Sequence, residues 1–418
     1  MSLINRNKVF IKIKNKDVEY TGIHNNTTAL TLISVNLHPN LLVGTHLIHL
    51  SLEATNIGRI EGNWPNLRTL NINDCRQLEL VEINAPTLAT ITLRRNNNLS
   101  NFILNNCTVA TQMSVNDCVA TTFFNMPSLK ELSFSDCEFD DLNLNCPNLQ
   151  RLVLDGLHNL LTLPNFVFPA LTFLHISNCA IDECVFDLQS LENLKLYELP
   201  NLRVLSCTVP NLELCSVSRC RALPRMKISA QLRLENVTIE RNDSLNMILI
   251  EALSLKNLRI SDSPVTRLDF NTTNLENVHI SGTRFKDDGI LMVLLTNNKN
   301  IKTFFCKSSV NNNDYGVYHR VLDRLALRVE DMEIESPGPP SLFATNYPPM
   351  NVNHLYLEIF NIPLERRLSI YLMLNNIHTF EGDDSILQVS LYLDRLSNPS
   401  DDEIRIIRRW RDTILHQV

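Results

Sequence analysis

Glycine is scarce in this chain, with only 10 Gly among 418 residues. Phosphate-binding loops need glycine at fixed positions, and tight hairpins favour it in their turns. The small supply therefore disfavours nucleotide-binding folds built on such loops and sheets built from many hairpins. Asparagine is abundant instead, at about 50 residues.

An excess of basic charge and long apolar runs are also missing. The net charge of −7 argues against a nucleic-acid binder, which normally carries a basic patch or stripe. No stretch approaches the roughly 20 apolar residues that cross a bilayer, so we expect no membrane span. Residues 1–10 lack the apolar run of a classical secretory signal. We therefore expect a cytoplasmic protein. The cytosol in question is either that of its own cell or that of a host cell into which it is delivered.

Motifs that carry chemistry are missing as well. The chain has no Walker-type phosphate loop, no Gly-x-Ser-x-Gly and no His-Glu-x-x-His. Most of the eleven cysteines recur at the repeat positions described next, so we expect reduced, buried thiols. The sequence thus predicts no catalytic residue, no metal and no cofactor.

The dominant feature is a repeat of the form apolar-x-x-apolar-x-apolar-x-x-(Cys, Asn or small). One copy reads Leu67-x-x-Leu70-x-Ile72-x-x-Cys75. The central apolar residues fall at positions 30, 50, 70, 91, 113, 132, 152, 174, 194, 215, 232, 258 and 278, in steps of mostly 19 to 22. So many copies at one spacing indicate a repeat protein.

This spacing predicts one short strand per repeat. Two apolar side chains separated by one residue point to the same side of a strand. Each coil buries that side only against its neighbours, so the strands should stack into a parallel sheet. In the repeat centred on Leu232, this assignment places Leu232 inward and Arg233 outward.

A weaker half-repeat lies between the main copies. One example is Leu78-x-x-Val81-x-Ile83, and a proline such as Pro86 often closes the unit. Such a half-repeat has only about 10 residues, which leaves no room for a helix that rises about 1.5 Å per residue. We therefore expect the second side of each coil to be extended or turn-like.

The pattern and its step resemble leucine-rich repeats, whose units span roughly 20–29 residues. Short, irregular units of this kind are similar to those of bacterial leucine-rich-repeat proteins and effectors. The phrasing Pro-Asn-Leu-x-x-Leu-x-Leu-x-x-Cys is also similar to plant and F-box-type repeat proteins. The resemblance covers about residues 8–306. It implies an α/β repeat solenoid, a horseshoe or arc with the parallel sheet on its concave face, in which a buried Asn or Cys satisfies the loop backbone.

The pattern changes toward the C-terminus. We expect residues 1–306 to form the solenoid, with an N-terminal strand cap from about residue 8. Residues 307–418 should form longer irregular repeats with capping helices. Ser400-Asp-Asp-Glu403 is a capping box that predicts a final helix. That helix either caps the last coil or contacts a partner through Trp410, Arg408 and Arg409.

The outward strand positions offer a candidate site. Small polar residues occupy them in the early repeats, and these should contribute little to binding. Aromatic and basic residues gather later, and aromatic and Arg side chains carry most binding energy in interfaces. The candidate partner-binding residues are Arg151, Phe173, His175, Lys195 and Tyr197.

These observations favour a non-enzymatic protein–protein recognition module, for example a bacterial effector that acts on a host protein. The alternative is a substrate-binding adaptor of a ubiquitin-ligase complex. The strand-like residues 9–13 leave no room for a helical F-box, which counts against that adaptor. A catalytic effector would need its activity in residues 307–418, where no constellation supports it.

Overall fold

The computed structural model describes residues 9–14, 19–20, 27–37, 46–118, 123–138, 142–163, 168–283, 298, 303–308, 329–335 and 352–358. The chain divides into two compact units. The first comprises Met1–Leu202 and Cys207–Val209, and the second comprises Arg203–Ser206 and Pro210–Val418. Among these described ranges, every regular element is a β-strand.

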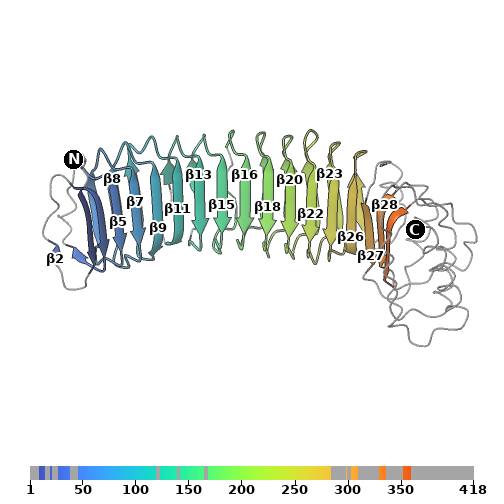
Figure 1. Ribbon diagram of the computed structural model, residues 1–418, viewed down its shortest axis with the longest axis horizontal. Helices are drawn as coiled ribbons and strands as arrows, with labels where there is room; N and C mark the ends of the chain where they lie inside the picture. The colour runs from blue at the N-terminus through green and yellow to red at the C-terminus, as the bar shows by residue number, and fades with distance from the viewer. Residues whose placement is uncertain are drawn as a thin grey trace, which may run out of the picture. The chain divides into compact units, whose positions relative to one another are not determined.

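Parallel strands, one per coil, form the main sheet of the first unit (Figure 1). Leu50 is the register partner of Leu70, and Leu70 is the partner of Ile91. The predicted repeat centres are therefore true neighbours in space. The strands are β1 (Val9–Lys14), β3 (Thr27–Ile33), β5 (His49–Glu53), β7 (Thr69–Asn73), β9 (Thr90–Asn96), β11 (Gln112–Cys118), β13 (Glu131–Ser135), β15 (Arg151–Asp155), β16 (Phe173–Ser177) and β18 (Asn193–Tyr197).

Alternating burial explains each strand. In β7, Leu70 and Ile72 are buried, whereas Thr69, Asn71 and Asn73 are only half-buried on the opposite side. Burying one leucine-sized side chain stabilises the fold by about 1.5–3 kcal/mol. A column of such residues through successive coils forms the core, as the period predicts.

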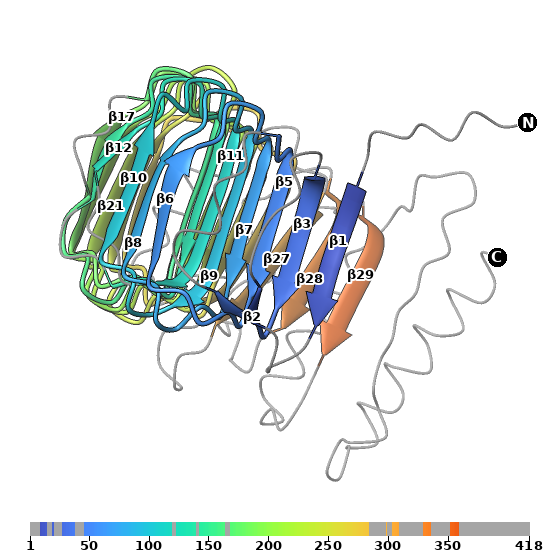
Figure 2. The ribbon, with the colours of Figure 1, turned by 90° about the vertical axis from the view of Figure 1, so that its left-hand side faces the viewer.

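The half-repeats form short parallel strands of their own, on the other side of the coil from the main sheet (Figure 2). In β8, Val81 and Ile83 point inward and are fully buried. The extended second side is thus confirmed. The strands are β6 (Arg59–Asn63), β8 (Leu80–Asn84), β10 (Asn101–Asn105), β12 (Phe123–Asn125), β14 (Asn143–Asn145) and β17 (Glu183–Asp187); β19 (Val204–Thr208) has residues in both units, and β2 (Glu19–Tyr20) pairs with β4 (Asn36–Leu37).

Buried Asn and Cys side chains satisfy the backbone where each coil turns away from the main sheet. The Asn96 side-chain oxygen accepts a hydrogen bond from the Cys75 amide at 3.0 Å. Its Nδ2 donates to the carbonyl of Ile72 at 3.1 Å. The Cys137 thiol donates to the carbonyl of Ser135 at 3.2 Å. The expected role of these residues is therefore present, since buried backbone groups need partners.

One residue per coil adopts a left-handed backbone conformation directly after the main strand. Asp74 has φ 53° and Asn178 has φ 52°. Their amides donate to carbonyls of the following coil, with Asp74 N to Arg94 O at 2.9 Å. Asp and Asn tolerate this conformation better than most side chains do, and in other coils Ser, Ala, Arg or Glu adopts it. Gly156 and Gly282 are exceptions, with φ 66° and 63°.

The second unit has the same two-sided coil. Its main strands are β20 (Leu214–Ser218), β22 (Asn236–Glu240), β24 (Asn257–Ser261), β26 (Asn277–Thr283), β27 (Thr303–Ser308), β28 (Val329–Glu335) and β29 (Val352–Glu358). Its second side contains β21 (Arg225–Ser229), β23 (Met247–Glu251) and β25 (Arg267–Phe270). The described pairings in both sheets are parallel.

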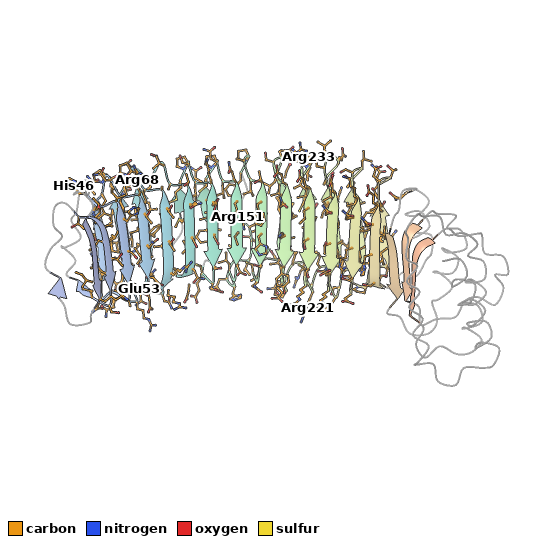
Figure 3. The ribbon with its side chains drawn as sticks, in the orientation of Figure 1. His46, Glu53, Arg68, Arg151, Arg221 and Arg233 are labelled. Atoms are coloured by element: carbon orange, nitrogen blue, oxygen red, sulfur yellow. The ribbon has the colours of Figure 1, made fainter. Side chains whose placement is uncertain are left out.

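One repeat centre was predicted wrongly. Leu232 is 66% exposed, whereas Val237 is buried and is the register partner of Cys215. The outward residue of this coil is consequently Thr238. Arg233 lies before β22, at the edge of the sheet (Figure 3). The correct centre also restores the terminal Asn of the repeat, because Asn242 accepts a hydrogen bond from the Cys220 amide at 2.9 Å.

The final helix expected from residue 400 lies outside the described residues. The same holds for the proposed contacts of Arg408, Arg409 and Trp410. The division into 1–306 and 307–418 therefore stays a prediction. Within the part of the chain that the structure describes, no helix is long and apolar enough to cross a membrane.

Candidate partner-binding surface

Five outward side chains of the first unit form what we call the cationic patch: Arg151, Phe173, His175, Lys195 and Tyr197. They come from three neighbouring strands, β15, β16 and β18, and alternate there with buried residues. Register places Arg151 opposite Phe173 and His175 opposite Lys195. Arg151 projects from the face of the main sheet (Figure 3). The structure thus brings all five predicted residues together on one face.

Phe173 holds the two cations of the patch. The Arg151 Cζ atom lies 3.8 Å from the centroid of the Phe173 ring, and the Lys195 Nζ atom lies 5.8 Å from it. Cations at such distances are attracted to the negative face of an aromatic ring. Phe173 is half-buried and is covered by the guanidinium, so it acts as a platform for charge more than as a bare hydrophobic contact.

His175 belongs to a short hydrogen-bonded chain. The Ser177 hydroxyl donates to Asp155 Oδ1 at 2.7 Å and lies 3.0 Å from His175 Nε2. Since the hydroxyl proton is used on Asp155, we infer that Nε2–H donates to Ser177. The Nδ1 atom is then a bare acceptor, and it is buried without a hydrogen-bond partner among the described atoms.

Electrostatics keep His175 neutral near pH 7. Burial lowers the pKa of His175, and Lys195 and Arg151 lower it further, whereas Asp155 raises it. The positive charge of the patch therefore comes from the guanidinium and the ammonium alone.

Two contributing residues escaped the sequence prediction. Asp155 and Ser177 look like ordinary polar residues at strand ends, yet they orient the imidazole. Tyr197 is half-buried at the end of β18, where it is the register partner of Ser177. The repeat spacing could have revealed that Asp155 and Ser177 are neighbours, because residues at the same repeat position become register partners across adjacent coils.

An open hollow adjoins the patch. It has a volume of about 230 Å³ and spans β9, β11, β13 and β15. Small side chains at the middle of these strands form its floor, and Gln112, Glu131 and Arg151 stand beside them. From the sequence we expected these polar coils to contribute little to binding. Their small residues instead leave a depression between larger neighbours.

The cysteines do not form a metal site in the described part of the chain. There, no three His, Cys, Asp or Glu side chains gather closely enough to hold an ion. Cys75, Cys118, Cys137, Cys179 and Cys220 are buried thiols outside any disulfide, as predicted. Burial raises the pKa of Cys137 and of Cys179 to about 12, which suppresses the reactive thiolate at neutral pH.

Two spacings invite a zinc interpretation. Four residues separate Cys179 from Cys184, and four separate Cys215 from Cys220, within the roughly two to four of structural zinc sites. Cys179 instead donates to the Ser177 carbonyl at 3.1 Å, and burial raises the pKa of Cys215 to about 12. The repeat columns thus account for the positions of these cysteines.

No sequence-family model matches the chain, and no curated protein matches it. Solved structures that are similar to it include the following two. YopM from Yersinia enterocolitica WA-314 shares 16% identity at a TM-score of 0.26, over 66% of this chain and 88% of its own. CroV588, described as a circular leucine-rich-repeat protein, shares 11% identity at a TM-score of 0.25, over 80% of this chain and 63% of its own. Likeness at these TM-scores carries no functional argument. The parallel coils and their repeat by themselves define a leucine-rich-repeat solenoid.

Proposed function

We propose that this chain is a non-enzymatic module that recognises a protein partner through the cationic patch of its first unit. The observation that carries the proposal is the placement of Arg151 and Lys195 against Phe173 on the outward face of the main sheet. Neither cation forms an ion pair within the described residues, so both remain available to a partner. Arg and aromatic anchors dominate binding energy in protein interfaces. An acidic partner surface fits this patch despite the net negative charge of the chain.

A pulldown with point variants tests the proposal. Phe173→Ala removes the platform under both cations, and Tyr197→Ala removes a rigid contact at the patch edge. Each should weaken partner capture by about 1–3 kcal/mol. Asn71→Ala changes an outward position of β7 away from the patch and is the matched control. Circular dichroism of each variant shows whether the fold persists.

Deletion of 400–418 supplies the opposing test. If that deletion abolishes capture while Phe173→Ala and Tyr197→Ala bind normally, the final segment is the recognition element and the proposal is wrong. The captured protein also separates the two roles considered from sequence. A host protein alone supports an effector, whereas ligase subunits together with a client support an adaptor.

A further inference from the structure

The hollow beside the cationic patch has an ordered lining. Register across the strands forms two parallel rows of outward side chains. One row runs through Gln112, Glu131 and Arg151, and the other through Thr92, Ser114 and Ser133. The floor therefore carries three hydroxyl groups, and Val153 continues the same row at β15. A carboxylate and a guanidinium stand next to each other on neighbouring strands at its edge.

Glu131 and Arg151 do not form an ion pair with each other in the part of the chain that is described, although they are direct register partners. Arg151 stacks on Phe173 instead. The backbone amide of Glu131 donates to the Thr111 carbonyl at 3.0 Å, whereas its carboxylate has no hydrogen-bond partner among the described residues. The hollow thus presents one uncommitted acceptor group beside one uncommitted donor group.

The size and charge of the hollow limit which ligand it can hold. At about 230 Å³ the hollow is smaller than the roughly 300–1,000 Å³ of sites for free small molecules, so it suits one side chain of a larger partner. An acidic side chain would meet Glu131, and a basic one would meet Arg151. A neutral amide avoids both repulsions, since its carbonyl accepts from the guanidinium and its NH₂ donates to the carboxylate.

We propose that this hollow is a subsite for an Asn or Gln side chain of an extended partner segment. The inference rests on the proposed function and adds the chemistry of the partner. Adjacent strands lie about 4.8 Å apart, so a point midway between Glu131 on β13 and Arg151 on β15 is roughly 7 Å from β16 in the cationic patch. That span is about two residues of extended chain. The partner segment therefore carries its amide two residues from an acidic residue that contacts Lys195.

A displayed peptide library tests this pairing on the full chain. The peptides are extended ten-residue segments of Thr, Ser and Val, with two randomised positions two residues apart. We expect Asn or Gln to be enriched at one position together with Asp or Glu at the other. Ser114→Leu fills the floor of the hollow and should lower binding of the selected peptide about tenfold, through loss of hydrogen bonds to charged groups. Ser51→Leu makes the same change in the same outward column at β5, outside the hollow, and should leave binding unchanged.

The other outcomes overturn this inference in distinguishable ways. Enrichment of the acidic residue alone refutes the amide subsite but leaves the proposed function intact. Enrichment of Lys or Arg in place of the amide means that Glu131 acts without Arg151, which also refutes it. If no position is enriched, or if Ser51→Leu weakens binding as much as Ser114→Leu, the hollow has no selective role.

Discussion

Outward basic side chains have different neighbours in the two units. In the second unit, basic side chains of one coil meet acids of another: Lys256 lies 2.7 Å from Glu235, and Arg259 lies 2.6 Å from Glu240. In the first unit, Arg151 and Lys195 lie against an aromatic ring instead. From the repeat alone, Arg259 and Lys195 occupy the same outward column. The difference teaches that an outward cation is a binding candidate only where the neighbouring coil does not neutralise it.

The largest expected effect is a loss of unfolding free energy, and it tests the register assigned to β22 in the second unit. Ile239→Ala deletes a fully buried side chain of β22 and should cost about 2–5 kcal/mol of unfolding free energy. Leu232→Ala changes a residue that is 66% exposed and should stay within about 0.5 kcal/mol. Urea unfolding measures both. Equal losses would restore Leu232 as the repeat centre and Arg233 as an outward residue.

The next effect compares the two left-handed glycines, one in each unit. A Cβ on Gly282 would lie 2.8 Å from the Cα of Asp262, whereas a Cβ on Gly156 would first meet the Asp136 side chain. A left-handed alanine alone costs roughly 1–2 kcal/mol. Gly282→Ala should therefore destabilise more than Gly156→Ala in thermal unfolding, because backbone yields less readily than a side chain.

Gly58→Ala is the control for these glycines. Its Cβ would have ordinary contact, with the Gln77 carbonyl oxygen at 3.8 Å. A melting temperature close to that of the unchanged chain is expected. A loss as large as that of Gly282→Ala would show that crowding from the adjacent coil is not the reason glycine is required.

A third prediction addresses the cations directly. Arg151→Ala should weaken partner capture by about 1–3 kcal/mol, as loss of an Arg anchor does. Arg259→Ala should leave capture unchanged and cost at most about 1 kcal/mol of stability, as is usual for an exposed ion pair. Titration of each variant against the purified partner measures the contrast. Equal losses of affinity would mean that pairing with an acid does not remove an outward cation from partner binding.

The smallest effect concerns pH. Because the pKa of His175 is lowered from its ordinary value of 6.5, the unfolded chain takes up a proton before the folded chain does. Above that value His175 is neutral in both states, and stability is lost as pH falls through 6.5 and below. Between pH 7 and pH 5, His175→Gln should therefore lose less unfolding free energy than the unchanged chain. A larger loss in the variant would mean that folding raises this pKa.

The register error in the second unit shows that an alternating apolar pair does not by itself fix the register of a repeat. Leu232 and Leu234 alternate as an inward pair should, and so do Val237 and Ile239. Spacing already favours the second pair, because Val237 lies 22 residues after Cys215, whereas Leu232 lies only 17 after it and the other steps are mostly 19 to 22. Asn242 supports the same choice, because only the second pair places it at the terminal position of the repeat.

The sequence by itself determined which residues become neighbours. A period of about 20 residues with an inward apolar pair makes equal repeat positions adjacent in a parallel sheet, and this is why the five patch residues could be assembled in advance. Only the tertiary structure decided what those neighbours do to one another. That Arg151 covers Phe173, that Ser177 orients His175 and that small residues leave a hollow beside Glu131 all depend on side-chain conformations and differences of an ångström or two. A repeat period specifies columns of residues, but it does not encode those distances.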